Sequence, residues 1–226
     1  EITRYVIDKG MLMMPGTATP GDMEQAMSMG LDVVKFFPAE QNGGVAKLKA
    51  VAGPYSNLRW MPTGGVNAKN LLDYLSFNKI IACGGTWMVK KDLIDAGNWE
   101  EITRLTREAV NTMLGLEFKH VGINCENEEA ALNAAKTFEA LFGFDYAVGN
   151  SSIFAGAKTI ELNKKPGRGK YGHIAVGTNT IDRAVAHLKA RGVAFDESSR
   201  VEKNGKLAAI YLQEEIAGFA VHLVQK

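Results

Sequence analysis

The stretch Asp32-Val-Val-Lys-Phe-Phe-Pro-Ala39 places a lysine, Lys35, in the middle of a short apolar run. A run of β-branched and aromatic residues that ends in proline is typical of a buried strand. Lysine is rarely buried without a partner, and a lysine that loses its charge there is an amine nucleophile able to form a Schiff base with a carbonyl substrate. The alternative is an edge strand whose lysine points into water. The run alone leaves both interpretations open.

Composition excludes several classes of protein. The 226 residues include 26 lysines and arginines against 25 acids, so charge gives no case for binding nucleic acid or an anionic membrane. The two cysteines, Cys83 and Cys125, lie far apart without metal-type spacing. That usage fits a reducing compartment, and we expect a cytoplasmic protein without a disulfide framework. No apolar run approaches the roughly 18 residues of a membrane span, and the N-terminus lacks a signal-peptide layout.

Residues 1–113 alternate between apolar runs and amphipathic segments. The expected strands are 11–14, the Lys35 run, 58–61 and 80–83. The expected helices are 1–9, 19–29, 44–52, 67–76 and 98–113. Successive strand–helix units joined by short loops predict a parallel sheet with right-handed crossovers.

Two Gly-Gly pairs follow the last two expected strands, in Pro62-Thr-Gly-Gly-Val66 and Cys83-Gly-Gly-Thr86. In (β/α)8 barrels the active site lies at the C-terminal ends of the strands, and a phosphate often sits in the loops after the seventh and eighth. Glycine lets backbone N–H groups approach a phosphate, whose charge a nearby helix N-terminus favours. One pair alone would indicate a tight turn, whereas two pairs at equivalent places favour phosphate binding.

These motifs carry a family resemblance. VVKFFPAE, MPTGGVN and ACGGTWMV, preceded by PGTATPGD, closely resemble the 2-keto-3-deoxy-6-phosphogluconate / 4-hydroxy-2-oxoglutarate (KDPG/KHG) aldolases from residue 1 to about 113. The resemblance implies that Lys35 is the Schiff-base lysine on the sixth barrel strand and that Phe37 is a wall of its pocket. It also implies a set of substrate- and phosphate-binding residues: Thr63, Gly64, Gly65, Gly84, Gly85 and Thr86. The family usually has serine where Thr86 stands, which keeps the hydroxyl.

The implied activity is a class I aldol cleavage that needs no cofactor. KDPG would give pyruvate and glyceraldehyde 3-phosphate, and 4-hydroxy-2-oxoglutarate would give pyruvate and glyoxylate. The implied fold of residues 1–115 is the C-terminal half of a (β/α)8 TIM barrel, strands five to eight. The family's general-base glutamate and carboxylate-binding arginine lie in the first half, and nothing marks Glu40 as that base. We therefore expect an N-terminal segment outside this sequence, or a partner that supplies the other half, and no aldol cleavage by this chain alone.

A second domain is expected at 116–226, because helical periodicity stops near Leu116 and alternating strands begin. A weak internal repeat aligns KHVGIN at 119–124 with GHIAVG at 172–177. Each copy leads into an amphipathic helix, 127–142 or 180–191, followed by three short strands. This α+β domain of two βαβββ modules resembles the vicinal oxygen chelate superfamily, as in glyoxalase I and methylmalonyl-CoA epimerase.

The repeat aligns His120 with His173 and Glu161 with His222. Alternation along the strands would let these four side chains converge inside one concave cup. By resemblance, they would hold a divalent metal, and this donor set suits Zn, Ni, Co or Fe more than Mg or Ca. A single buried histidine is more often a hydrogen-bonded core residue, but all four family positions hold a competent ligand. His187 is expected on a helix surface.

We therefore expect a keto-acid lyase with an appended metal-binding domain. One alternative makes the C-terminal domain a glyoxalase-like, metal-dependent isomerase or lyase, and another makes it a non-catalytic binding or dimerisation module. The basic loop 163–170 is interpreted as a solvated connector. The expected partners are a small keto acid or phosphosugar and further copies of the chain, as a trimer by family resemblance or a dimer through the C-terminal domain. Nucleic acid and membranes are not expected partners.

Overall fold

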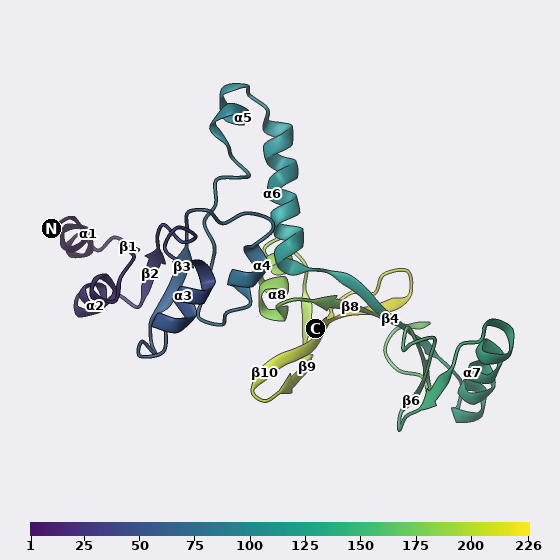
Figure 1. The fold of residues 1–226 in the computed structure, drawn as a ribbon. Helices are drawn as coiled ribbons and strands as arrows, with labels where there is room; N and C mark the ends of the chain where they lie inside the picture. Colours follow the sequence, from purple (N-terminus) through teal and green to yellow (C-terminus); the bar gives the residue numbers. More distant parts are fainter. The chain divides into compact units, whose positions relative to one another are not determined.

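The computed structural model describes all 226 residues and divides into two compact units, Glu1–Met113 and Leu114–Lys226. Figure 1 labels the helices and most of the strands of both units. Each unit combines helices with a sheet, so the protein is of mixed α/β class. None of the helices has both the length and the apolar character needed to cross a membrane.

The N-terminal unit alternates short strands with helices. Its helices are α1 (Ile2–Asp8), α2 (Pro20–Ser28), α3 (Gly44–Val51), α4 (Leu71–Leu75), α5 (Lys91–Asp95) and α6 (Trp99–Leu114). Its strands are β1 (Gly16–Thr17), β2 (Val33–Phe36) and β3 (Arg59–Pro62). They pair in the order β1-β2-β3, and both pairs are parallel, as the strand–helix alternation predicts.

Two of the four expected strands differ from their predicted form. The first lies at Gly16–Thr17 rather than at 11–14, because the backbone joins the sheet only where it reaches the end of β2, with Gly16 opposite Lys35. The run 80–83 is not a continuous strand. It is attached to the sheet by two parallel bridges, Trp60 to Ile80 and Thr63 to Gly84. An apolar run in the sequence indicates a segment that can become a strand. A continuous strand also requires a neighbouring strand that is in register with it.

Helix α2 begins at a capping box that can be read from the sequence. The Thr19 side chain accepts a hydrogen bond from the Asp22 backbone N–H, and the Asp22 carboxylate accepts one from the Thr19 N–H at 2.9 Å. Pro20 occupies the first helical position, where its missing N–H leaves no bond unmade. These contacts satisfy donors that a helix start otherwise leaves free.

The core of the N-terminal unit lies on one face of its sheet. Val34 and Phe36 of β2 are fully buried there, while Val33 and Lys35 point to the other face and are partly exposed. Lys35 is therefore less buried than the apolar run suggested. Helices α2, α3 and α4 contribute to the core beside the strands, with Met23, Leu48, Trp60, Leu71 and Tyr74 among its members.

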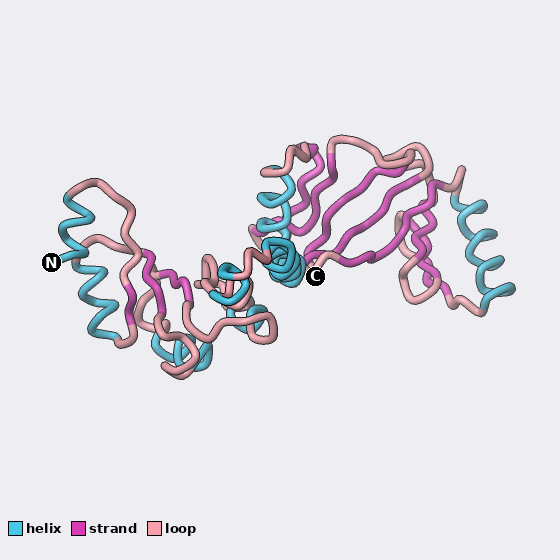
Figure 2. Tube along the Cα trace, turned by 90° about the horizontal axis from the view of Figure 1, so that it is seen from above, coloured by secondary structure: helices cyan, strands magenta, loops and turns pink.

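The C-terminal unit consists of two βαβββ modules, which confirms the repeat in the sequence. The first contains β4 (Glu117–Asn124), α7 (Glu128–Phe142), β5 (Tyr146–Val148), β6 (Ser152–Ala155) and β7 (Ile160–Asn163). The second contains β8 (Gly172–Thr178), α8 (Ile181–Lys189), β9 (Phe195–Lys203), β10 (Lys206–Leu212) and β11 (Phe219–Gln225). Together they form one eight-stranded sheet in the order β5-β6-β7-β4-β8-β11-β10-β9, with its strands magenta in Figure 2.

Pairing in the sheet has the same pattern in both modules. β4 pairs with β7 and β8 with β11, both in parallel, and β4 and β8 join the modules antiparallel. Ala131 and Ala135 of α7 pack against Ile153 and Leu162 on one face of the first module. Because neighbouring residues of a strand point to opposite faces, Glu161 projects from the face that α7 does not cover.

Candidate functional site

The register of the C-terminal sheet brings ligand-type side chains of three strands to one face. Gly122 of β4 lies opposite Glu161 of β7 on one side and opposite His173 of β8 on the other. Residues directly opposite in a ladder share a face and lie side by side. Glu161 and His173 therefore flank a position that has no side chain of its own.

The other two expected ligands, His120 and His222, are arranged in the same way around a small residue. Ala175 of β8 lies opposite His120 of β4 on one side and opposite His222 of β11 on the other. Ala175 is completely buried. On this face of the sheet, the four expected ligands therefore surround Gly122 and Ala175, which have no side chain or only a methyl group.

The nitrogen and oxygen atoms of this cluster are close together. His120 Nε2 lies 3.1 Å from His173 Nε2. Glu161 Oε2 lies 3.2 Å from His120 Nε2 and 3.3 Å from His173 Nε2. One ligand nitrogen from each of His120, His173 and His222 falls within a set whose members are all within 4.8 Å of one another. Two nitrogens on one tetrahedral Zn²⁺ are about 3.3 Å apart, given Zn–N bonds of about 2.0–2.1 Å, so these spacings suit a shared ion.

Gly122 is a steric requirement of this arrangement. A Cβ atom added there would lie 2.1 Å from Cε1 of His173, far inside van der Waals contact. The His173 ring therefore lies over the backbone of β4, where it reaches His120 and Glu161. This role was not identified from the sequence, although a signal exists: Gly122 and Ala175 each follow the aligned histidine by two residues.

The pKa shifts of Glu161 and His222 favour the charge states in which these groups bind metals. Burial by itself would raise the pKa of Glu161, but hydrogen bonds from His120, His173 and Ser152 outweigh it and hold that pKa well below its usual range. Burial lowers the pKa of His222 to about 4, and the neighbouring His173 and His120 add to the effect. An ionised carboxylate and a neutral imidazole are the forms that coordinate metals. Neither ring nitrogen of the buried His222 has a hydrogen-bond partner.

Tyr211 and Arg168 lie beside the cluster. The Tyr211 ring stacks on His222 with centroids 4.5 Å apart, and the Arg168 guanidinium lies 4.9 Å from the Tyr211 ring centroid. Arg168 also pairs with Asp196 at 2.7 Å. The loop 163–170 is thus tied to the sheet at this residue rather than being a wholly solvated connector. His187 is partly exposed on α8, where its ring lies 3.2 Å from an Arg191 nitrogen.

In the N-terminal unit, the expected substrate residues gather at the C-terminal ends of the strands. Lys35 lies between Gly16 of β1 and Met61 of β3 in the ladder. Thr63 follows β3 directly, and a Cβ on Gly84 would lie 2.6 Å from the Thr63 hydroxyl oxygen. Thr63 and Gly84 are therefore in close contact one strand away from Lys35.

The glycine loops contact the loop that follows the lysine strand. Gly64 has a φ of +95°, and a Cβ there would lie 3.3 Å from the ring of the half-exposed Phe37. A Cβ on Gly65, with a φ of +81°, would lie 2.6 Å from Cβ of Glu40. Gly85 is covered by the Trp87 ring, and Thr86 is exposed.

The carboxylate of Glu40 is already engaged in a hydrogen bond. The hydroxyl of Tyr74, a core residue on α4, donates a hydrogen bond to the Glu40 carboxylate. Burial and the Glu40 contact raise the pKa of Tyr74. The hydrogen bond to a core tyrosine explains the position of Glu40 structurally, so nothing identifies Glu40 as a general base.

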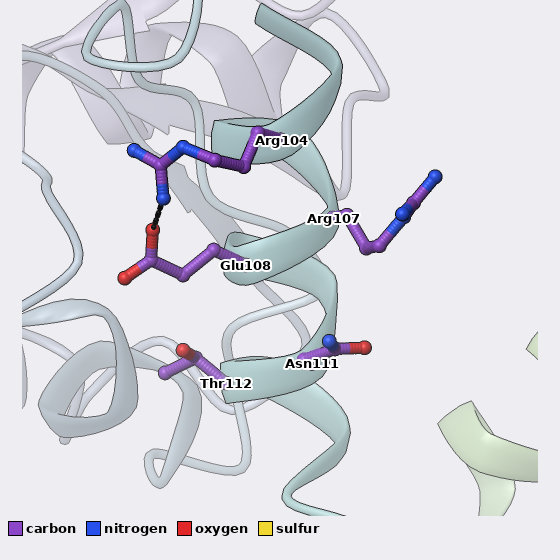
Figure 3. A pocket seen from close by; sticks show the side chains of 5 residues that line it. All are labelled: Arg104, Arg107, Glu108, Asn111 and Thr112. Atoms are coloured by element: carbon purple, nitrogen blue, oxygen red, sulfur yellow. Dashed lines mark hydrogen bonds and ion pairs between the residues drawn. The ribbon is translucent and has the colours of Figure 1, made fainter. Parts of the chain in front are cut away.

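A shallow hollow of about 440 Å³ lies on α6, lined by Arg104, Arg107, Glu108, Asn111 and Thr112. Figure 3 shows that Arg104 and Glu108 pair on one side of the helix, whereas Arg107 and Asn111 extend from the other. The side chains do not converge on a common point, so we assign no ligand to this surface.

Two classes of site are defined by these arrangements: a lysine on a parallel strand beside glycine loops, and a histidine–glutamate cluster on a βαβββ repeat. Residues 1–105 match the family described as KDPG and KHG aldolase. The 2-dehydro-3-deoxy-phosphogluconate aldolase of Haemophilus influenzae is 47% identical over 111 residues, which are 49% of this chain and 52% of that protein. The family resemblance of the N-terminal unit is thereby confirmed. The chain spans about half the length of the curated relatives it matches.

Solved structures resemble each unit separately. A KDPG aldolase of Legionella pneumophila, with pyruvate captured as a covalent carbinolamine intermediate, is 37% identical with a TM-score of 0.41, covering 42% of this chain and 46% of that one. A methylmalonyl-CoA epimerase is 18% identical with a TM-score of 0.38, covering 48% of this chain and 93% of that one.

Proposed function

We propose that the N-terminal unit supplies the Schiff-base lysine and glycine loops of a class I keto-acid aldolase acting on KDPG, 4-hydroxy-2-oxoglutarate or both. The observation that carries the proposal is the position of Lys35 on β2, on the face opposite the helix-packed Val34 and Phe36. The confirmed family match supports it. In a (β/α)8 barrel the face away from the helices is the interior, where substrate reaches the strand ends. We infer that 1–115 corresponds to strands five to eight of such a barrel.

The proposed chemistry begins at Lys35 Nζ. The amine attacks the 2-keto carbon, and loss of water gives a protonated imine that accepts electrons. Removal of the C4 hydroxyl proton then breaks the C3–C4 bond, which leaves an enamine of pyruvate and an aldehyde. Protonation of the enamine at C3 gives the imine of pyruvate, and hydrolysis of that imine releases pyruvate and restores the lysine. Thr63, Gly64 and Gly84 would line the substrate, while the proton acceptor is not assigned to Glu40 because Tyr74 occupies that carboxylate.

Borohydride trapping tests this proposal directly. The chain is incubated with pyruvate, reduced with sodium borohydride, digested and analysed by mass spectrometry. We expect the reduced pyruvate adduct on Lys35 and its loss in Lys35→Arg, which keeps the charge but not the nucleophile. Lys69→Arg, a change at an exposed lysine, should leave the adduct unaffected. Adducts spread over surface lysines, with no preference for Lys35, would contradict the assignment.

We propose a second function for residues 116–226: binding of a divalent transition metal by His120, Glu161, His173 and His222. The observation that favours it is the unpaired, buried His222, because an orphaned polar ring in a core has a cost that a metal would remove. A bound Zn, Ni, Co or Fe ion would supply Lewis-acid polarisation of a substrate oxygen. Glu161 would bring a negative charge, and the three neutral imidazoles would complete the donor set.

Metal analysis separates the alternatives for this unit. The whole chain is purified without chelators or metal-affinity tags, its metal content is measured, and Zn²⁺ binding to the stripped protein is titrated. We expect one ion per chain, and a large loss of affinity in His173→Ala. The absence of binding would leave a non-catalytic interaction module, whereas binding is required of a glyoxalase-like isomerase or lyase.

The assembly state is a separate proposal. We expect a homo-oligomer, either a trimer as the aldolase resemblance implies or a dimer through residues 116–226. Light scattering after size-exclusion chromatography distinguishes the two masses from each other and from a monomer of 24.5 kDa.

A further inference from the structure

Ser152 of β6 is a buried polar residue that the sequence did not single out. Its side chain is inaccessible, with 3% of the residue exposed. Its hydroxyl donates a hydrogen bond of 2.7 Å to Oε1 of Glu161. A buried hydroxyl without such a bond would be destabilising, so this contact fixes the serine and the carboxylate to each other.

The contact makes the two oxygens of Glu161 different. Oε1 faces Ser152, while Oε2 lies 3.2 Å from His120 Nε2 and 3.3 Å from His173 Nε2. Rotation of the carboxylate would break the bond to Ser152. Only Oε2 is therefore directed at the histidine nitrogens.

The internal repeat shows that the strand itself does not require a hydroxyl here. Phe154 lies opposite Glu161, and Tyr211 lies opposite the aligned His222. Two residues before each of these are Ser152 in the first module and Ala209 in the second. The hydroxyl is present in the module whose ligand is a carboxylate and absent in the module whose ligand is an imidazole. A role toward the carboxylate accounts for this difference.

We propose that Ser152 is a positioning residue that makes Glu161 a one-oxygen ligand, through Oε2, of the metal proposed for residues 116–226. The inference rests on that proposed metal centre. Groups that hydrogen-bond a ligating side chain orient it and raise the affinity of the site. Ser152 does this by holding Oε1, so that the glutamate neither chelates with both oxygens nor turns away.

The first test compares Zn²⁺ affinity among variants of the full chain, with a competing chelator as the reference. We expect Ser152→Ala to weaken binding by about 10- to 100-fold, and Ser152→Thr, which keeps the hydroxyl, to recover most of it. Ser151→Ala is the matched control, because that neighbouring serine is exposed. Circular dichroism of the stripped proteins checks that the variants fold. Equal affinity of wild type and a folded Ser152→Ala would overturn the inference.

The second test needs no variant and decides the matter if Ser152→Ala does not fold. A crystal structure of the Zn²⁺-loaded wild-type chain should show one Glu161 oxygen, Oε2, at about 2.0–2.2 Å from the ion. Oε1 should remain within hydrogen-bonding distance of Ser152. Coordination by both oxygens, or by the oxygen that accepts the Ser152 hydrogen bond, would refute the inference while leaving the metal centre intact. Failure of the wild-type chain to bind any metal would refute the metal centre and the inference with it.

Discussion

The ring of His222 stacks on the ring of Tyr211 with a centroid separation of 4.5 Å and an interplanar angle of 14°. The two residues lie opposite each other on β11 and β10. The stack satisfies the faces of the imidazole but not its nitrogens, both of which are buried without a partner. His222 is therefore packed well and hydrogen-bonded poorly, and the metal proposed for residues 116–226 would account for this combination.

Replacing His222 by leucine tests that distinction. An unsatisfied buried polar group costs about 1–3 kcal/mol, so His222→Leu should leave the metal-free protein as stable as wild type or more stable. Wild type should be stabilised by Zn²⁺, and the variant should lose that stabilisation. Thermal unfolding with and without Zn²⁺ measures both effects. Strong destabilisation of the metal-free variant would instead indicate that His222 is a structural residue.

Gly122→Ala should disrupt the cluster by a steric route. The added Cβ would lie 2.1 Å from Cε1 of His173, so the ring must move away from His120 and Glu161. Forcing a side chain into a packed site costs about 1–3 kcal/mol, and we expect Zn²⁺ affinity to fall with it. Denaturant unfolding and metal titration provide the two readouts. Gly53→Ala, where a Cβ meets nothing within 4 Å, is the control; similar losses in both variants would contradict the steric explanation.

The α2 cap should make the stability of the N-terminal unit depend on pH. Hydrogen bonds from the Ala18 and Thr19 backbone and from the Thr19 hydroxyl lower the pKa of Asp22. Because the folded pKa lies below the unfolded one, the ionised cap stabilises fully above about pH 4 and is lost as pH falls through the lowered pKa. Asp22→Asn should flatten this acid-side slope in denaturant titrations between pH 2 and about pH 6. An unchanged slope would show that other carboxylates account for it.

Gly84→Ala should impair phosphate binding in the proposed aldolase site without impairing Schiff-base formation at Lys35. Its Cβ would lie 2.6 Å from the Thr63 hydroxyl oxygen, so the phosphate-side loops must shift, whereas Lys35 stays on its strand. We expect the borohydride-trapped pyruvate adduct at Lys35 to persist within about twofold, because pyruvate carries no phosphate. Protection of that adduct by glyceraldehyde 3-phosphate should weaken at least about tenfold, a loss of about 1.4 kcal/mol. Equal protection of wild type and Gly84→Ala would contradict the assignment of Gly84 to the phosphate site.

The helices expected at 19–29 and 127–142 are present as α2 and α7, because the interactions that begin and end a helix are close in sequence. Thr19 and Asp22 form the cap of α2 through bonds that span three residues, and Gly143 ends α7 in the left-handed conformation at a φ of +69°. The βαβββ repeat was likewise visible, because each helix and strand has its own periodicity. The run 80–83 was harder, because its hydrogen bonds depend on β3, a different segment of the chain.

The sequence by itself determined which side chains are available: a lysine in an apolar strand, two Gly-Gly loops after strands, and histidines and a glutamate at aligned repeat positions. Only the tertiary structure decided which of them meet. His120, Glu161, His173 and His222 share one face because β4 pairs with both β7 and β8, and β8 pairs with β11. The contacts of Ser152 and Gly122 with this cluster also depend on strand register, since a shift of one residue between paired strands would turn a proposed ligand to the opposite face. Register between strands that are distant in sequence is set by packing of the whole sheet, and no short motif encodes it.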